Sequence, residues 1–128
     1  MAIKFMSKDW EAAMQKGLAE EFNTKGKVTT TFVQIMTDCP DGKDLWTLVE
    51  LKDGVFVRYE IGEGDPPEYE LAAVGKYEIH KGCVQGKIDG AKCITTGDMK
   101  LKGNMVKAMK LLGTYSRMEE VEQSIEVE

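Results

Sequence analysis

The 128-residue sequence predicts an α+β fold, with helices packed on a mainly antiparallel sheet. Three patterns predict this class. An apolar stripe at helical spacing opens the chain at residues 8–22, and three runs rich in β-branched and aromatic residues follow between residues 28 and 61. Within residues 97–112 the hydrophobic period then changes from that of a strand to that of a helix. The expected order is helix, three-strand meander, crossing strand, helix, strand, helix and helix.

The first helix is expected over residues 8–22. Ser7 can cap its N-terminus, and acidic residues follow in the first turn, where the helix dipole favours them. Four large apolar residues recur at steps of four: Trp10, Met14, Leu18 and Phe22. Such a stripe normally packs on a sheet.

The first strand is expected at residues 28–37, followed by a turn at 38–42 in which Pro40 presets φ. Asp53 and Gly54 then connect strands 45–51 and 55–61. A two-residue turn there would put the apolar residues of the two strands on opposite faces. A three-residue loop with Gly54 in the left-handed region unites them. We therefore predict the pairs Leu51 with Val55, Val49 with Val57 and Leu45 with Ile61, with Tyr59 on the same inner face.

The outer face of this hairpin carries more apolar side chains than a solvent face needs: Trp46, Leu48 and Phe56. Either a dimer contact or scattered surface apolar residues would account for them. Residues 62–67 contain two prolines and are expected to cross the surface, because proline cannot sit in a central strand.

The second half of the chain is expected to supply a fourth strand near residues 69–73, a helix over 76–87, a strand over 98–102 and a helix over 104–112. Asn104 can cap the last of these. The apolar residues expected to face inward here are Tyr77, Val84, Met99, Leu101, Met105, Met109 and Leu112. A capping box at Ser116 predicts a separate C-terminal helix over 117–126.

Composition disfavours several classes of function. A pI near 5.0 and the lack of aromatic residues among the lysines disfavour nucleic-acid binding. The three cysteines have no Cys-x-x-Cys spacing, so buried thiols are expected rather than a disulfide framework or a metal site. Cys83 and His80 are the only plausible nucleophile and base, and nothing evident orients them, so we expect neither catalysis nor a cofactor. Without a long apolar run or signal peptide, a cytoplasmic location is the default expectation.

The charge is distributed unevenly along the chain. Residues 76–117 carry nine basic and three acidic residues, whereas the chain as a whole has a net charge of −5. This basic stretch is expected to approach an anionic membrane surface transiently, through Lys100, Lys102, Lys107 and Lys110. A solvated lysine face neutralised by the acidic C-terminal residues is the alternative.

Residues 85–111 resemble a known family. They run Gln-Gly-Lys-Ile-Asp, a spacer containing Ala91, Gly-Asp-Met-Lys-Leu-Lys-Gly-Asn and Ala-Met-Lys-Leu. This is similar to the C-terminal half of the sterol carrier protein-2 domain, the non-specific lipid-transfer family, and the upstream order of elements agrees. The resemblance implies a single lipid-binding domain over residues 1–128. Its sheet would have five strands, with helices on one face enclosing an apolar tunnel.

By this resemblance the chain would bind and transfer a fatty acid, fatty acyl-CoA or sterol-like ligand without catalysis, as a monomer or homodimer. The residues expected to line the tunnel are Trp10, Met14, Leu18, Phe22, Leu45, Val49, Val57, Tyr59, Ile61, Tyr77, Val84, Met99, Leu101, Met105, Met109 and Leu112. Residues 117–126 are expected to be weakly held and to act as a lid. A scaffold or dimerisation module of a lipid-metabolising enzyme is the alternative function.

Overall fold

The computed structural model describes residues 2–21, 29–53, 55–104, 106 and 118–127. Within these residues the elements, in chain order, are α1 (Lys8–Glu21), β1 (Thr30–Thr37), β2 (Leu45–Lys52), β3 (Val55–Glu63), β4 (Leu71–Lys76), α2 (Tyr77–Val84), α3 (Gly90–Thr96) and β5 (Met99–Gly103). Residues 118–124 are also helical and are called the C-terminal helix below.

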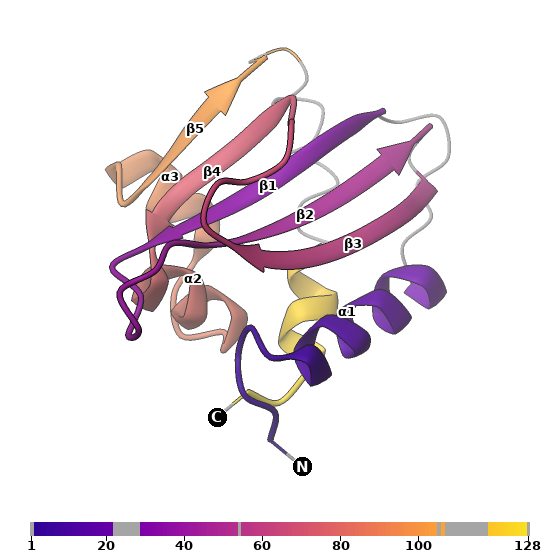
Figure 1. Ribbon diagram of the computed structural model, residues 1–128, viewed down its shortest axis with the longest axis horizontal. Coiled ribbons are helices and arrows are strands. Elements are labelled where there is room, and N and C mark those ends of the chain that lie inside the picture. Colours follow the sequence, from indigo (N-terminus) through magenta and orange to yellow (C-terminus); the bar gives the residue numbers. More distant parts are fainter. Residues whose placement is uncertain (1, 22–28, 54, 105, 107–117, 128) are drawn as a thin grey trace.

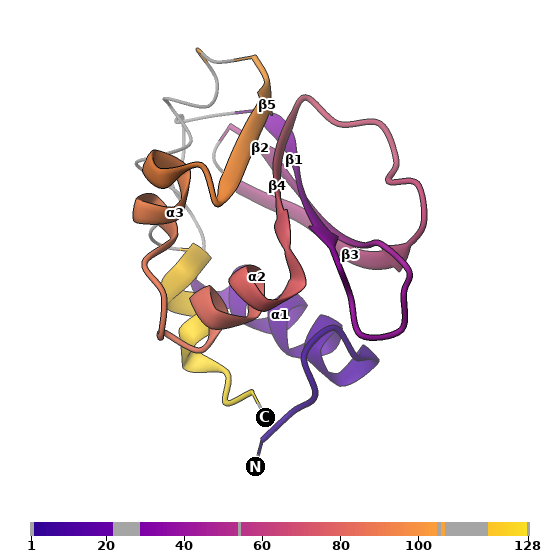
Figure 2. The same ribbon diagram turned by 90° about the vertical axis from the view of Figure 1, so that its left-hand side faces the viewer.

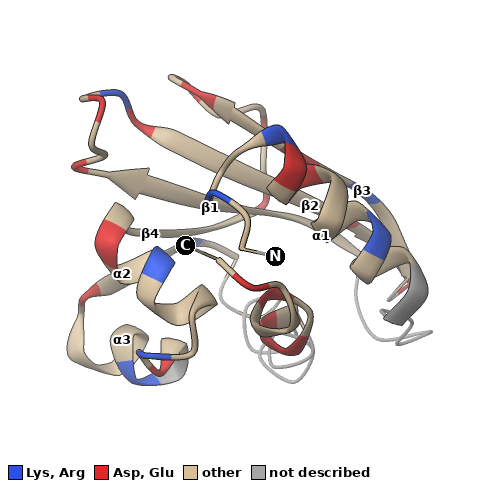
Figure 3. Cartoon of the chain, turned by 90° about the horizontal axis from the view of Figure 1, so that it is seen from below, with Lys and Arg blue, Asp and Glu red and all other residues tan. Residues whose placement is uncertain are grey.

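The strands form one mixed sheet in the order β3-β2-β1-β4-β5 (Figure 1). The neighbouring strands are antiparallel except for β1 and β4, which are parallel. The α1 helix, α2 and the C-terminal helix cover one face of the sheet (Figure 2), and the C-terminal helix lies between α1 and α2 (Figure 3). The predicted fold class, a five-stranded and mainly antiparallel sheet with helices on one face, is confirmed.

Two predicted helix caps are present. The backbone N–H of Trp10 donates to Ser7 Oγ at 3.2 Å, at the start of α1. The backbone N–H of Val106 donates to Asn104 Oδ1 at 3.0 Å, directly after β5. Each side-chain oxygen satisfies a backbone donor that a helix start leaves without an intrahelical partner. The remainder of the helix predicted over 104–112 lies outside the described residues, as does the predicted cap at Ser116.

The predicted register of the β2–β3 hairpin is wrong. Lys52 pairs with Val55, so two residues separate the strands, and Asp53 adopts a positive φ of 52°. A bulge then shifts the register, because Glu50 pairs with Arg58 while Leu51 pairs with Phe56. Val57 is the extra residue, and its side chain is 49% exposed. One inserted residue reverses which side chains face the core.

The bulge explains how the two-residue turn, which the hydrophobic pattern argued against, still leaves most apolar side chains of the hairpin on one face. Beyond it, Val49 pairs with Tyr59 and Thr47 with Ile61, so the large side chains of β3 still face the helices. Before it, Phe56 takes the inner position opposite Leu51 that was expected for Val55. Leu45 pairs with Glu63 rather than Ile61. The inward face was thus predicted correctly throughout β2, but on β3 only for the half beyond the bulge.

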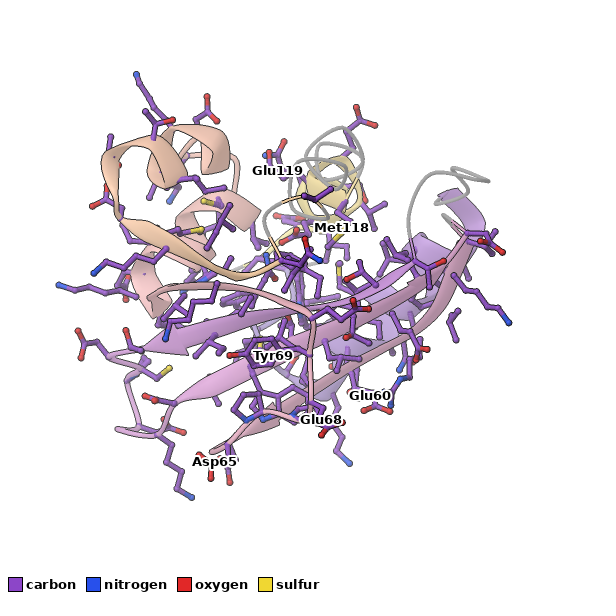
Figure 4. All side chains as sticks on the ribbon, turned by 90° about the horizontal axis from the view of Figure 1, so that it is seen from above. Glu60, Asp65, Glu68, Tyr69, Met118 and Glu119 are labelled. Carbon is purple, nitrogen blue, oxygen red and sulfur yellow. The ribbon has the colours of Figure 1, made fainter. Side chains whose placement is uncertain are left out.

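The outer face of the sheet is covered by the segment that joins β3 to β4. Figure 1 shows residues 64–70 crossing this face, and Figure 4 places Glu68 and Tyr69 on the side of the sheet opposite Met118. The Glu70 N–H donates to the carbonyl oxygen and to Oγ1 of Thr31, at 3.1 and 3.0 Å. Leu48 is therefore fully buried within the chain rather than available for a dimer contact.

Gly103, at the end of β5, offers a test of this packing. It has a φ of +109°, and a Cβ there would meet the carbonyl oxygen of Glu70. Gly97 also has a positive φ, of +86°, but a Cβ there would have no heavy atom within 4 Å. We expect Gly97→Ala to cost about 1 kcal/mol from backbone strain, and Gly103→Ala to cost about 1–3 kcal/mol more, from the clash. Urea denaturation measures both, and equal costs would contradict the close approach of β5 to Glu70.

Candidate functional site

The candidate site is the apolar layer between the sheet and the helices. Its buried members, called the interior cluster, are Phe5, Trp10, Met14, Leu18, Phe32, Met36, Cys39, Val49, Leu51, Tyr59, Leu71, Ala73, Tyr77, Val84, Met118 and Val121. They come from the N-terminal segment, α1, all strands but β5, α2 and the C-terminal helix, and from the turn after β1. The cluster therefore joins both ends of the described chain with most of the sheet, but α3 and β5 contribute no buried member.

The structure brings together about half of the predicted site residues. The members of the interior cluster are Trp10, Met14, Leu18, Val49, Tyr59, Tyr77 and Val84. Leu45, Ile61 and Leu101 are partly buried and pack against it. Four predicted residues, Phe22, Met105, Met109 and Leu112, lie outside the described residues. A role in ligand binding stays a prediction for all of them.

Two predicted site residues lie elsewhere. Val57 is moved outward by the bulge and does not join the interior cluster. Met99 is buried, but in a separate cluster with Cys83 and Cys93, next to α3. Both residues fit an alternating strand pattern, which tells apart the two faces of a sheet but does not identify the helix that covers each part of a face.

Sequence reasoning missed several members of the cluster. Met118 and Val121 lie in the segment 117–126 that was expected to act as a lid, and they are only 2% and 6% exposed. Leu51 was expected on the inner face of the hairpin but not among the residues that line the site. The other missed residues are Phe5, Phe32, Met36, Cys39, Leu71 and Ala73. On β1 and β4 the signal was present as alternation, since Phe32, Met36, Leu71 and Ala73 occupy alternating positions of their strands.

Side chains of α1 hold the helix against the edge strand β3. Gln15 Nε2 donates to the carbonyl oxygen of Tyr59 at 2.9 Å, and Glu11 Oε2 accepts from the N–H of Ile61 at 2.9 Å. An edge strand has backbone groups without a neighbouring strand. Here α1 satisfies two of them and fixes the apolar stripe of the helix over the sheet.

A polar contact lies within the apolar layer. Trp10 Nε1 donates to Tyr59 Oη at 3.2 Å, and the Phe5 ring meets the Trp10 ring edge-to-face at 5.2 Å between centroids. Burial raises the pKa of Tyr59 far above its usual range, and the negative charge of Glu122 raises it further. The Tyr59 hydroxyl therefore stays protonated and serves as a hydrogen-bonding group.

Glu122 of the C-terminal helix is the unexpected member of this region. It is only 5% exposed, and its Oε1 has no hydrogen-bond partner. Burial, and then the charge of Glu119, raise the pKa of its carboxyl group to about 8, so the group is neutral at pH 7. In the sequence, the burial of Glu122 is indicated only by its position: it follows Met118 by four residues and so shares its helix face.

The C-terminal segment is tied to both α2 and the N-terminus. Ile3 forms a parallel bridge with Val127 and donates its N–H to the Glu126 carbonyl at 2.8 Å. Gln123 Nε2 donates to the Cys83 carbonyl at 3.3 Å. A surface pocket of about 350 Å³ lies along this junction, lined by Val84, Gln85, Lys87 and residues 123–127. This pocket adjoins the interior cluster, because Val84 belongs to both.

A larger surface pocket, of about 680 Å³, lies on the opposite side of the sheet. It is lined by Thr31, Arg58, Pro66, Pro67, Glu68, Tyr69 and Glu70. Arg58 forms ion pairs with Glu50 and Glu60, at 2.7 and 3.3 Å. None of these lining residues belongs to the interior cluster, so this pocket does not lead to it.

The two residues considered for catalysis do not form a nucleophile–base pair. His80 Nε2 donates to the Ile35 carbonyl at 3.2 Å, and burial lowers the pKa of His80 to about 4. Burial also raises the pKa of the Cys83 thiol to about 12, so the reactive thiolate is scarce at neutral pH. Among the described residues, no cluster of three metal-binding side chains occurs, and no helix is long and apolar enough to cross a membrane.

Glu122 and His80 together predict how stability depends on pH. In the unfolded chain Glu122 loses its proton near pH 4.5, whereas in the folded chain it keeps the proton up to about pH 8. The free energy of unfolding therefore falls as the pH rises through this window. His80 has the opposite effect between about pH 4 and 6.5, where only the unfolded state binds a proton at His80, so the free energy of unfolding rises with pH there. The two effects oppose each other below pH 6.5. Between pH 6.5 and 8, the free energy of unfolding should fall by up to about 1.4 kcal/mol per pH unit.

Urea denaturation between pH 5 and 8.5 measures this slope. In Glu122→Gln the fall between pH 6.5 and 8 should be largely removed, because the variant has no ionisable group at this position. Glu120→Gln is the matched control, because Glu120 lies on the same helix but is exposed. A wild-type slope that survives Glu122→Gln unchanged would rule out a buried neutral carboxyl group at this position.

No protein-family model matches the sequence, and no curated protein matches it. Solved structures do match its fold. A crystal structure of sterol carrier protein 2 matches with a TM-score of 0.81 and 13% identity, over 95% of this chain and 99% of that chain. The solution structure of the conserved hypothetical protein TT1886 from Thermus thermophilus also has a TM-score of 0.81 and 13% identity, over 99% of this chain and 93% of that chain.

A third match is to a palmitated protein. Palmitated SCP2L2 from Aedes aegypti matches over the full length of both chains, with a TM-score of 0.57 and 16% identity. At such identities the likeness concerns the fold. The fold expected from the resemblance of residues 85–111 is thus confirmed, and the chain has the fold of sterol carrier protein 2.

Proposed function

We propose that this protein binds a lipid-like apolar ligand between its sheet and its helices and carries it without chemical change. One observation carries the proposal: the match to sterol carrier protein 2 with a TM-score of 0.81 over 95% of the chain. The interior cluster lies in the layer where such a ligand would be enclosed. Palmitated SCP2L2 adds a long acyl chain as one ligand class.

The energetics suit a reversible carrier. Burying a 16-carbon chain contributes about 0.8 kcal/mol per CH₂, or about 12 kcal/mol gross. Association costs about 4–15 kcal/mol, so the net affinity is modest. The thioethers of Met14, Met36 and Met118 are flexible and polarizable, which suits a site that accepts ligands of several shapes.

The alternative function, a scaffold or dimerisation module, has less support. The apolar outer face that suggested a dimer contact is covered by residues 64–70 of the same chain. Its most apolar residue, Leu48, has no exposed surface. The catalytic alternative loses its only candidate pair, because His80 and Cys83 are buried and not activated.

Two neighbouring alanines of β4 provide a test of where the ligand lies. Ala73 belongs to the interior cluster, and Ala72 is fully buried on the outer face. If the ligand occupies the interior, Ala73→Leu should weaken binding of a fluorescent C16 fatty acid about tenfold or more, by occupying its space. Ala72→Leu adds the same volume on the other face and should leave the affinity within about twofold.

Fluorescence titration of the delipidated chain measures both affinities, with circular dichroism to establish that each variant is folded. Trp10 emission should also respond to the ligand, because its ring is buried in the same layer. A wild-type chain that is folded but binds no acyl chain or sterol at about 100 µM would refute the carrier proposal. Equal losses in the two variants would place the ligand elsewhere.

The exposed lysines of β5 lead to a proposal about membrane contact. Lys100 and Lys102 are both exposed. Lys107 and Lys110 lie outside the described residues, and their part stays a prediction. Binding to anionic vesicles should weaken as salt rises, because the Debye length falls from about 30 Å at 0.01 M to about 8 Å at 0.15 M.

Charge reversal separates a local contact from general charge effects. The double variant Lys100→Glu/Lys102→Glu should lose most vesicle binding at low salt. Lys8→Glu/Lys16→Glu makes the same charge change at exposed positions of α1 and should bind nearly as well as the wild type. Sedimentation with phosphatidylserine-containing and neutral vesicles measures this, and equal binding to both vesicle types would refute the membrane contact.

A further inference from the structure

Glu122 is a buried carboxyl group without an evident structural purpose. Its Oε1 is fully shielded from solvent and has no hydrogen-bond partner. Among the residues that the structure describes, no lysine or arginine forms an ion pair with it. Buried polar groups in proteins are nearly always satisfied, so each exception requires an explanation.

The position of Glu122 places it at the apolar layer. Met118 and Val121, one turn before it and directly before it, are members of the interior cluster. Figure 4 shows the C-terminal helix, with Met118 labelled, on the helix side of the sheet. Burial, and then Glu122, raise the pKa of Tyr59 of β3, whose hydroxyl accepts a hydrogen bond from Trp10. Besides its apolar side chains, the layer thus contains buried polar groups, which we call its polar end: Glu122, Tyr59 and Trp10, with Thr47 and Gln34 of the inner sheet face next to Tyr59.

Among the described residues, the charged groups that act at this end of the layer are negative rather than positive. Glu119 lies on the same helix and raises the pKa of Glu122. Cys83 on α2 is affected by both carboxyl groups. Glu11 on α1 already accepts a hydrogen bond from the Ile61 N–H. An anionic head group at this end would meet like charges in a region of low dielectric, where repulsion is strong.

A neutral carboxyl group offers one O–H donor and free acceptor positions. A ligand hydroxyl matches it, because a hydroxyl can donate to one carboxyl oxygen and accept from the other. A plain hydrocarbon would leave Oε1 unsatisfied, and an ammonium group would require burial of a charge. We infer that Glu122 is a specificity-determining residue that receives the neutral hydroxyl group of an apolar ligand at the polar end of the interior cluster. This inference rests on the proposed function.

Matched ligands test the inference. The delipidated full-length chain is titrated at pH 7 with 1-dodecanol and with dodecanoate, by displacement of a fluorescent acyl probe. The wild type should bind the alcohol about tenfold more tightly than the carboxylate, a difference of about 1.4 kcal/mol. Glu122→Leu should bind the alcohol about tenfold more weakly and so lose the preference.

Two further variants identify the cause. Glu122→Gln keeps a donor and an acceptor without an ionisable group, and should keep the alcohol affinity within about threefold. Glu120→Leu makes the same change as Glu122→Leu at an exposed position of the helix and should bind like the wild type. Because burial of leucine is favourable, Glu122→Leu should remain folded, and Glu122→Gln provides the second variant if it does not.

The outcomes separate the inference from the function on which it rests. If the wild type binds dodecanol and dodecanoate equally, or if Glu122→Leu keeps the alcohol preference, the inference is overturned while ligand binding stands. If no acyl, alcohol or sterol ligand binds, the proposed function itself fails.

Discussion

The parallel pairing of β1 with β4 is the constraint on which the rest of the structure depends. All other neighbouring strands are antiparallel, a pairing that short connections can make. To enter the sheet parallel to β1, however, the chain must leave β3 at one edge and cross the sheet before β4 begins. Residues 64–70 make this crossing over the outer face, on which Leu48 and Val33 are fully buried. The sheet thereby has two covered faces, and its helix side is left for the interior cluster.

Much of this fold could be predicted from the sequence because its elements carry strong local signals. The stripe of α1 and the cap at Asn104 are short-range features that survive in the folded chain. The β2–β3 register could not be obtained in this way. The two-residue turn conflicts with the hydrophobic pattern only while the strands pair regularly, and the bulge at Val57 removes that conflict. A bulge depends on twist and on packing across strands, which a pattern of alternation does not contain.

The candidate site was predictable to a similar extent and for similar reasons. Spacing alone predicted that Trp10, Met14 and Leu18 face inward, and the chain buries them. It did not reveal Glu122, because a glutamate near the end of an acidic segment has the pattern of a solvated residue. Met99 was misplaced because α3 forms its own small cluster with β5, a tertiary arrangement that strand alternation cannot specify. The inferred specificity thus depends on Glu122, the residue that departs from the hydrophobic pattern.

The bridge between Ile3 and Val127 joins the two ends of the chain. Phe5 follows Ile3 and packs on Trp10, while Val121 lies close against Gly17 of α1. Withdrawing the C-terminal helix would therefore disturb the N-terminal segment and α1 as well. In native-state hydrogen exchange, the amides of these distant segments would open together with one free energy, as a single foldon. Access to the interior would then be governed by a joint opening of both ends rather than by a hinged helix.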